Sequence, residues 1–202
     1  MIIRSFTILL LLISLFAQAV QASVVSVEGE KGGGSGKAQF TLNYPISFVR
    51  QVLNNDKLFI QLLPGVMLWQ VMENSPKGQV AKCKMAMGKM VPPANYTVKV
   101  DKVSADEVRF KRLKGDLKNL EGYWKIEQGS DPSSTKVTYF YKVDTGMKMV
   151  PKPIIEKELR RHLVETEMKT SSQMKKLYSS VAHDSKPANV QLSGSSNSSR
   201  VD

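Results

Sequence analysis

The stretch NLEGYWKIEQGSDPSSTKVTYFYKVD, residues 119–144, consists of two runs of alternating apolar and polar residues on either side of a turn. Alternation with a period of two is typical of a strand that has one dry face and one wet face. The Gly, Ser, Asp and Pro residues between the runs favour a turn. The stretch therefore predicts an antiparallel hairpin with one face covered. Its apolar side consists of Leu120, Gly122, Trp124, Ile126, Val137, Tyr139, Tyr141 and Val143.

The same alternation recurs in five segments that precede this hairpin. With the hairpin they bring the number of predicted strands to seven, enough for a sheet with an extensive apolar face. Since the apolar and polar residues alternate cleanly, we expect the strands to be antiparallel. The five segments are residues 37–44, 66–74, 78–87, 95–103 and 106–113.

Three other segments have helical periodicity. Residues 46–55 follow Pro45, and residues 57–63 follow a capping Asn55 or Asp56. From Pro153 onward, apolar residues recur in steps of three and four over roughly 25 residues, which makes a helix about 37 Å long. The opposite face of this last helix is polar and carries Lys157, Arg160, Arg161, Glu165, Lys169 and Lys175.

These elements predict an α+β fold with the order β-α-α-β6-α. The apolar face of the sheet must be covered, and only the last helix is long enough to cover it. A twisted, curved seven-stranded antiparallel sheet cannot contact a straight helix everywhere. We therefore expect the sheet to wrap around the C-terminal helix and to leave a space between the two.

The two ends of the chain differ in composition from the predicted domain at 37–178. Residues 1–22 have an early cation, a short apolar run and small residues at the end, which is the pattern of a secretory signal peptide cleaved after Ala22 or Ala19. The alternative is an uncleaved membrane anchor, although the apolar run of about eleven residues is short for a membrane span. The Gly-rich leader at 23–36 is expected to be flexible, and the Ser-rich tail at 179–202 is expected to be disordered. The protein is thus expected to be exported, to the periplasm or beyond the cell.

The net charge of +11 favours an anionic partner. Export makes nucleic acid an unsuitable partner and leaves an anionic membrane surface as the better candidate, although a basic surface that serves solubility alone is the alternative. One cysteine excludes an intramolecular disulfide. No feature of the sequence favours an oligomer, so we expect a monomer.

Few residues suggest catalysis. Cys83 lies on the apolar side of a predicted strand and is interpreted as a core residue. His162 lies beside the apolar stripe of the last helix, where it either lines the cavity or marks its boundary. No Cys or His cluster has metal-ligand spacing, and no cofactor motif is present. An enzymatic role therefore remains a hypothesis, less favoured than a binding role.

The order of elements and several short motifs resemble the START-like (SRPBCC) superfamily, which has the helix-grip fold. The match is most specific to its polyketide cyclase/dehydrase and coenzyme Q-binding, or lipid transport, branch. The matching residues are Gly115, the EGYW of 121–124, Thr138-Tyr139, Val143-Asp144, Pro151 or Pro153, and the opening YPISFVRQVLNNDKLFIQLLPGV of 44–66. The resemblance implies a cavity for a hydrophobic ligand but no particular ligand.

Adaptable methionines and aromatic side chains with one polar tip suit the lining of such a cavity. The alternative is that these side chains simply fill the core. The candidate ligand-binding residues are Met67, Trp69, Met85, Met87, Tyr96, Trp124, Tyr139, Tyr141, Leu159, His162 and Thr166.

Two similar apolar and cationic stretches, KMVPPA at 89–94 and KMVPKP at 148–153, are predicted to form loops at the cavity mouth. Their apolar tips could enter a bilayer while the lysines meet anionic headgroups. An equally good interpretation is a lid over the helix end. The candidate membrane-contact residues are Lys89, Met90, Val91, Lys148, Met149, Val150 and Lys152.

The sequence thus favours an exported START-like protein that binds or transports a lipid or another hydrophobic small molecule. A cyclase- or dehydratase-like enzyme acting in the same cavity is the alternative. An interaction module whose groove is filled by its own side chains is the third possibility.

Overall fold

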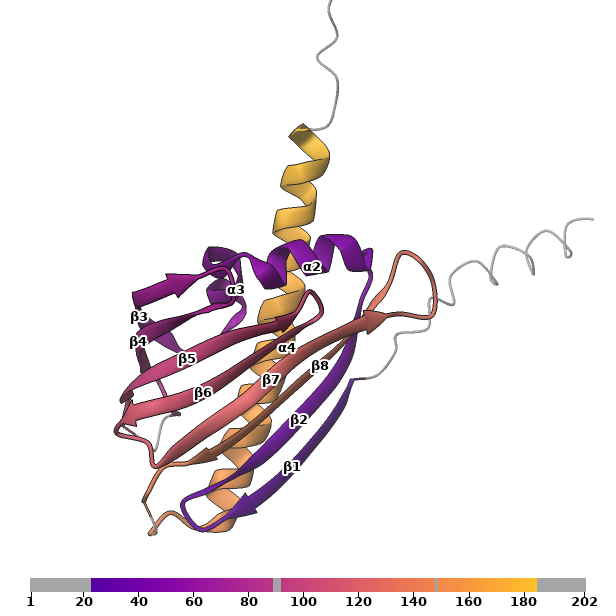
Figure 1. Cartoon of the computed structure of the whole chain (residues 1–202). Coiled ribbons are helices and arrows are strands. Elements are labelled where there is room, and N and C mark those ends of the chain that lie inside the picture. Colours follow the sequence, from indigo (N-terminus) through magenta and orange to yellow (C-terminus); the bar gives the residue numbers. More distant parts are fainter. Residues whose placement is uncertain (1–22, 89–91, 148, 185–202) are drawn as a thin grey trace, which may run out of the picture.

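The computed structural model describes residues 23–88, 92–147 and 149–184. The expected signal peptide at 1–22 lies outside them. The elements follow one another as shown in Figure 1. They are β1 (Val24–Glu30), β2 (Gly33–Leu42), α2 (Ile46–Asn54), α3 (Asp56–Leu62), β3 (Val66–Ser75), β4 (Gly78–Met85), β5 (Ala94–Ser104), β6 (Glu107–Gly115), β7 (Asn119–Gln128), β8 (Thr135–Asp144) and α4 (Lys152–Asp184).

The strands form one curved antiparallel sheet in the order β1-β2-β8-β7-β6-β5-β4-β3. It bends around α4, as the predicted helix-grip fold requires (Figure 1). The hairpin β7–β8 is in register as expected, with Trp124 opposite Tyr139 and Gly122 opposite Tyr141. The α+β architecture is therefore confirmed, although the described residues form eight strands rather than seven.

The additional strand corrects the prediction of a flexible leader at 23–36. These residues form β1 and the beginning of β2, which pair from Val24 opposite Gln39 to Glu30 opposite Gly33. Composition alone suggested flexibility, but the ladder satisfies the backbone hydrogen bonds of this segment. The C-terminal boundary also differs from the prediction, because α4 continues to Asp184. Residues 185–202 of the expected tail lie outside the described residues.

The short helices α2 and α3 connect β2 to β3 at one end of the sheet. Asn55 caps α3, since its side-chain oxygen accepts hydrogen bonds from the backbone N–H groups of Lys57 and Leu58. Phe59 and Leu62 of α3 are buried in the core. The two helices therefore close one end of the space that the sheet encloses.

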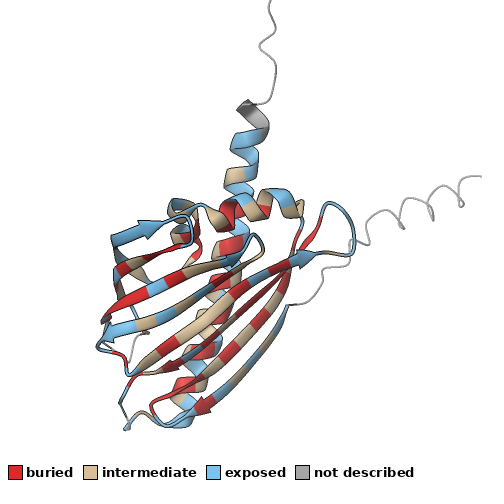
Figure 2. Cartoon of the chain, in the orientation of Figure 1, coloured by how far each residue is buried: buried red, intermediate tan, exposed pale blue. Residues whose placement is uncertain are grey.

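The apolar stripe of α4 packs mainly against β1, β2 and α3. Figure 2 shows buried residues in alternation with less buried ones along the strands and at intervals along α4. Residues Leu159, Leu163, Thr166, Thr170 and Met174 are buried along this stripe. Because α4 lies toward the β1–β2 edge, the inner face of β4–β6 remains open to a cavity. No helix in the described part of the chain is long and apolar enough to cross a membrane.

Candidate functional site

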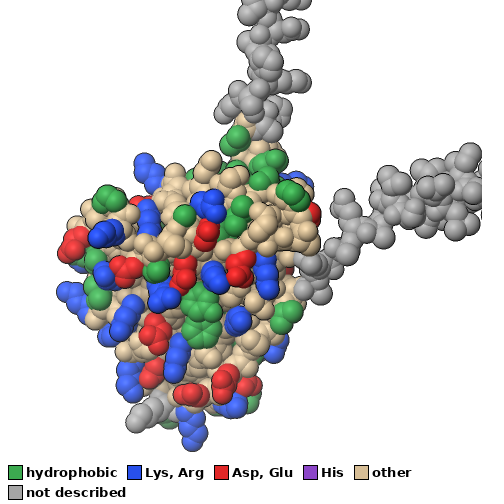
Figure 3. All heavy atoms as spheres, turned by 45° about the vertical axis from the view of Figure 1, so that its right-hand side comes forward, with side chains coloured by type: hydrophobic (Ala, Val, Ile, Leu, Met, Phe, Trp, Pro, Cys, Tyr) green, Lys and Arg blue, Asp and Glu red, His purple; other side chains and the backbone are tan. Residues whose placement is uncertain are grey.

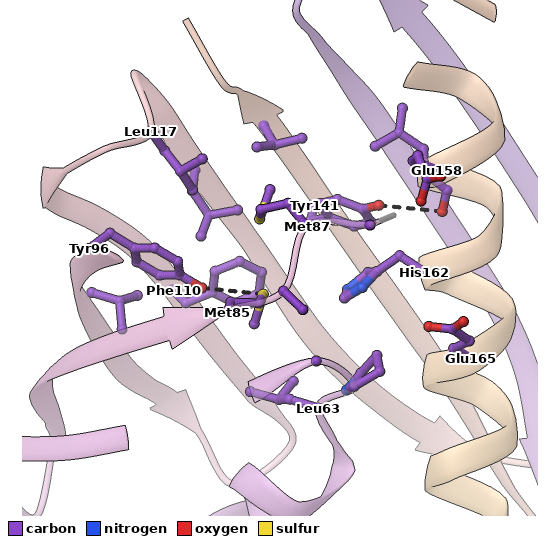
Figure 4. A pocket seen from close by; sticks show the side chains of 18 of the residues that line it. Leu63, Met85, Met87, Tyr96, Phe110, Leu117, Tyr141, Glu158, His162 and Glu165 are labelled. Atoms are coloured by element: carbon purple, nitrogen blue, oxygen red, sulfur yellow. Dashed lines mark hydrogen bonds between the residues drawn. The ribbon is translucent and has the colours of Figure 1, made fainter. Parts of the chain in front are cut away.

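A cavity of about 340 Å³ lies between the inner face of the sheet and α4. Its walls come from the six strands β3 to β8, from α3 and α4, and from the connections α3–β3, β4–β5, β6–β7 and β8–α4. Figure 4 shows apolar side chains such as Phe110 and Leu117 on the sheet side, with His162 pointing into the cavity from α4. Small-molecule sites in proteins are typically of this kind, mostly apolar with a few polar groups.

Eight of the eleven candidate ligand-binding residues line this cavity. They come from β3, β4 and its end, β5, β8 and α4, segments far apart in the sequence that the curvature of the sheet brings together. They are Trp69, Met85, Met87, Tyr96, Tyr139, Tyr141, Leu159 and His162.

Met67 does not line the cavity, and its side chain is 59% exposed. The register between β3 and β4 shifts between Val66 and Leu68, so Met67 has no partner across the ladder. Such a bulge reorients the side chain. Met67 was predicted to share the cavity side of the strand with Trp69, two residues away. The bulge makes this prediction wrong.

Trp124 and Thr166 are buried, but outside the cavity lining. The indole of Trp124 packs against Phe59 at 5.9 Å and Tyr139 at 4.7 Å between ring centroids. The hydroxyl of Thr166 donates a hydrogen bond of 2.7 Å to the carbonyl oxygen of His162. For these two residues the alternative of core packing is correct.

Three charged residues of α4 reach the cavity: Glu158, Arg161 and Glu165. Of these, Arg161 and Glu165 were assigned from the sequence to the polar face opposite the apolar stripe. Arg161 is in ion pairs with both carboxylates, at 2.7 Å from Glu158 and 2.7 Å from Glu165. The sequence indicates both ion pairs, because Arg161 lies three residues after Glu158 and four residues before Glu165. Most of the other lining residues that sequence reasoning missed are apolar, including Phe59, Leu63, Leu117 and Ile155.

The polar part of the cavity wall is a group of two tyrosines and one histidine. The hydroxyl of Tyr139 lies 3.3 Å from Nε2 of His162. The hydroxyl of Tyr141 donates a hydrogen bond of 3.3 Å to the carbonyl oxygen of Leu159. The two tyrosine rings are stacked at 5.5 Å between centroids. Strand β8 and helix α4 thus hold these groups in one place.

All three of these side chains are neutral near pH 7. Burial, with a further effect of the Arg161 guanidinium, lowers the pKa of His162 from 6.5 to about 4. Burial raises the pKa of Tyr139 and Tyr141 above the ordinary value. His162 is partly buried and lines the cavity. The site can therefore offer hydrogen bonds but no full charge at this position.

On the β5 wall, the hydroxyl of Tyr96 lies 3.4 Å from the sulfur of Met85. Cys83 is buried, and burial raises the pKa of its thiol. It is a core residue, as its position on the apolar side of the strand indicated. In the described part of the chain, no three His, Cys, Asp or Glu residues are arranged to hold a metal ion.

The candidate membrane-contact residues are only partly described. Lys89, Met90, Val91 and Lys148 lie outside the described residues. Met149 is 95% exposed, whereas Val150 packs partly buried against the core. The ammonium of Lys152 is exposed, at 3.7 Å from Glu156. Of the described residues, Met149 and Lys152 are thus accessible from outside.

Several solved structures are similar to this fold at low sequence identity. The human StAR-related lipid transfer protein 5 has a TM-score of 0.62 at 10% identity, with 86% of this chain and 95% of that chain covered. A START superfamily protein from Mycobacterium smegmatis has a TM-score of 0.61 at 12% identity, covering 72% and 99%. The Zhui aromatase/cyclase from Streptomyces sp. R1128 has a TM-score of 0.56 at 12% identity, covering 80% and 96%.

At this level of identity, these structures establish the fold and not the activity. No curated protein matches the sequence. The family model for polyketide cyclase/dehydrase and lipid transport proteins matches residues 42–164, which is more than half of the chain and includes most of the cavity wall. The chain is therefore a START-like member of the polyketide cyclase/dehydrase and lipid transport family, whose fold provides a site for a hydrophobic ligand.

Proposed function

We propose that this protein is exported and that it holds or carries one hydrophobic molecule, such as a single-chain lipid, in the cavity between sheet and α4. The observation that supports this most directly is the cavity of about 340 Å³, with its apolar walls and its neutral polar groups. Family membership supports the same class of ligand.

The volume limits the size of this molecule. It lies near the lower end of the roughly 300–1,000 Å³ that small-molecule sites occupy. This size suits one small ring system or one acyl chain and is small for a lipid with two long chains.

Binding is favoured over catalysis by the state of the ionisable groups at the cavity. An efficient general base has a pKa near the working pH. The pKa of His162 is lowered to about 4, so its imidazole is a weak base at pH 7. Glu158 and Glu165 are in ion pairs with Arg161.

Export is proposed from the sequence pattern of residues 1–22. The test is cell fractionation with N-terminal sequencing of the mature protein. A mature chain that begins after residue 19 or 22 in the exported fraction would support the proposal. Retention of the full-length chain in the cytoplasm would contradict it.

Loading from a membrane is proposed from the exposure of Met149 beside the exposed Lys152 and from the net charge of +11. Cations of both types and carboxylates are interspersed on the face seen in Figure 3, so a concentrated basic patch is not visible there. Co-sedimentation with vesicles of anionic and of neutral phospholipid tests this step. Equal sedimentation of wild type and Met149→Ser would contradict a role for this side chain.

The central experiment is native purification followed by mass spectrometry of the extracted hydrophobic molecules. Ala86 is exposed and lies at the cavity wall, so Ala86→Trp should obstruct the cavity. The exposed Ala105, in the β5–β6 turn, gives Ala105→Trp as the matched control. We expect a bound molecule in wild type and control and a several-fold lower occupancy in Ala86→Trp. Equal occupancy in all three would place the molecule elsewhere.

A further inference from the structure

After Tyr139 and His162 form their mutual hydrogen bond, one hydrogen-bond donor of the two side chains is still free to bind an acceptor. A tyrosine hydroxyl and a neutral imidazole together possess two hydrogens that can be donated, one O–H and one N–H. The contact of 3.3 Å between Tyr139 and Nε2 of His162 uses one of them, whichever tautomer is present. Within the described part of the chain, the imidazole has no second hydrogen-bond partner. The pair therefore retains the ability to donate one hydrogen bond.

The position of the pair favours a ligand as the acceptor. His162 points into the cavity from α4, opposite the apolar residues of the sheet wall (Figure 4). The neighbouring hydroxyl of Tyr141 is already donating to the carbonyl oxygen of Leu159. The remaining donor faces the cavity, so an oxygen atom on a bound molecule could accept its hydrogen bond and stabilise the complex.

The charges around the pair disfavour an ionised acid. Arg161 contacts both Glu158 and Glu165, so the three side chains have a combined charge of +1 − 2 = −1. A carboxylate or phosphate ligand would meet two carboxylates and a cation that is already paired. Transfer of an unpaired ionised group into an apolar cavity is itself strongly unfavourable.

From these three observations we propose that the ligand is an uncharged molecule with an alcohol or ketone oxygen at one end. This oxygen accepts a hydrogen bond from the Tyr139–His162 pair, and the apolar remainder lies against the sheet wall around Phe110 and Leu117. The inference rests on the proposed function, because it specifies the ligand class of the same cavity.

Tryptophan fluorescence provides a direct measurement. The chain has two tryptophans, and only Trp69 lines the cavity. In a Trp124→Phe background, Trp69 is the sole reporter, and the substitution removes no hydrogen bond because Nε1 of Trp124 has no partner among the described residues. The probes are 1-decanol, 2-decanone, decanoic acid and decylamine, titrated at pH 7.5.

We expect 1-decanol and 2-decanone to bind at least about tenfold more tightly than decanoic acid, given the cost of an unpaired charge. Replacement of the imidazole in His162→Leu should weaken 1-decanol binding about five- to tenfold, the usual effect of one hydrogen bond, and leave decanoic acid unchanged. Tyr139→Phe, which preserves the ring, should reduce 1-decanol binding in the same direction. Tyr123→Phe is the matched control, because it removes a tyrosine hydroxyl outside the cavity lining, where the ring stacks on Phe140, and it should change binding less than twofold.

Equal affinity for decanoic acid and 1-decanol would overturn the inference while leaving the proposed function intact. Unchanged binding of 1-decanol to folded His162→Leu and Tyr139→Phe would do the same. A preference for decylamine would assign recognition to Glu158 and Glu165 instead. If none of the four probes alters the fluorescence of Trp69, the proposed function itself fails.

Discussion

Gly36 of β2 leaves the space that Leu163 of α4 occupies. A Cβ added to Gly36 would lie 2.9 Å from Cδ1 of Leu163 and 3.4 Å from a ring carbon of Tyr141. Leu163 is fully buried, so its side chain has little room to move. Helix and sheet therefore approach closely at this point, next to Tyr141, which lines the cavity.

The substitution Gly36→Val should therefore lower the free energy of unfolding by about 2 kcal/mol, because extra carbons in a close-packed core force displacement. Chemical denaturation followed by circular dichroism measures it. Ser35→Val is the matched control on the outer face of the same strand, where the change should stay within about 0.5 kcal/mol. Equal effects of the two substitutions would mean that the contact with Leu163 does not limit the packing.

This relationship also explains why the beginning of the domain was misassigned from the sequence. The glycines of 29–36 were interpreted as a flexible leader because glycine favours flexible segments. In the structure, Gly36 is needed for close packing, and Gly34 has a φ of 155°, which suits glycine. Composition cannot distinguish a glycine required by a tertiary contact from one in a linker. The alternating strands after Leu62, by contrast, were all predicted correctly in type.

Thr170 and Thr166 are both buried on α4, but only Thr166 has a partner for its hydroxyl among the described residues. The substitution Thr170→Val keeps the branched shape and removes an unpaired hydroxyl. It should stabilise the protein by about 1 kcal/mol, which is a typical gain from removing an unsatisfied buried group. The midpoint of thermal unfolding measures this gain.

The matched control is Thr166→Val, which removes the hydrogen bond of 2.7 Å to the carbonyl oxygen of His162. It should not raise the unfolding midpoint. If the two substitutions shift the midpoint equally upward, the apolar methyl group of valine explains the gain, and the unpaired hydroxyl of Thr170 does not.

Lys169 connects α4 to the rim of the cavity, because its ammonium donates a hydrogen bond of 2.7 Å to the carbonyl oxygen of Leu63. The substitution Lys169→Met keeps the length of the side chain and removes this bond. We expect a loss of about 1 kcal/mol in the free energy of unfolding, at the lower end for bonds to charged groups because Lys169 is only partly buried. The exposed Lys176 provides the control Lys176→Met, which should have no measurable effect. Comparable losses in both variants would assign the effect to charge alone.

How far the candidate site could be predicted depended on the local geometry of each element. Alternation placed Met85, Tyr96 and Tyr139 correctly, because β4, β5 and β8 are regular where they line the cavity. It failed at Met67, where a bulge shifts the register of β3. The polar spacing of α4 likewise hid Arg161 and Glu165, since the cavity leaves this side of the helix without a covering strand. Bulges and uncovered helix faces are tertiary features that periodicity does not reveal.

The lowered pKa of His162 predicts how stability depends on pH. The groups that face it are Tyr139 and Tyr141 from β8 and Arg161, Glu158 and Glu165 from its own helix. Above pH 6.5 the imidazole is neutral in both folded and unfolded chains, so it contributes no pH dependence. Between pH 6.5 and about 4 the unfolded chain takes up a proton and the folded chain does not. The folded state therefore loses stability as the pH falls through this window.

The substitution His162→Gln should remove this part of the pH dependence. Thermal unfolding is measured from pH 7.5 to 4.5 in a His183→Gln background, so that His162 is the one histidine that titrates. We expect the difference in unfolding midpoint between this background protein and its His162→Gln variant to be constant above pH 6.5 and to change in favour of the variant below it. At pH 7.5, a ligand that accepts a hydrogen bond from the neutral Tyr139–His162 pair should raise the unfolding midpoint of the background protein more than that of the His162→Gln variant. Parallel pH profiles of the two proteins would show that His162 is as accessible to protons in the folded chain as in the unfolded one.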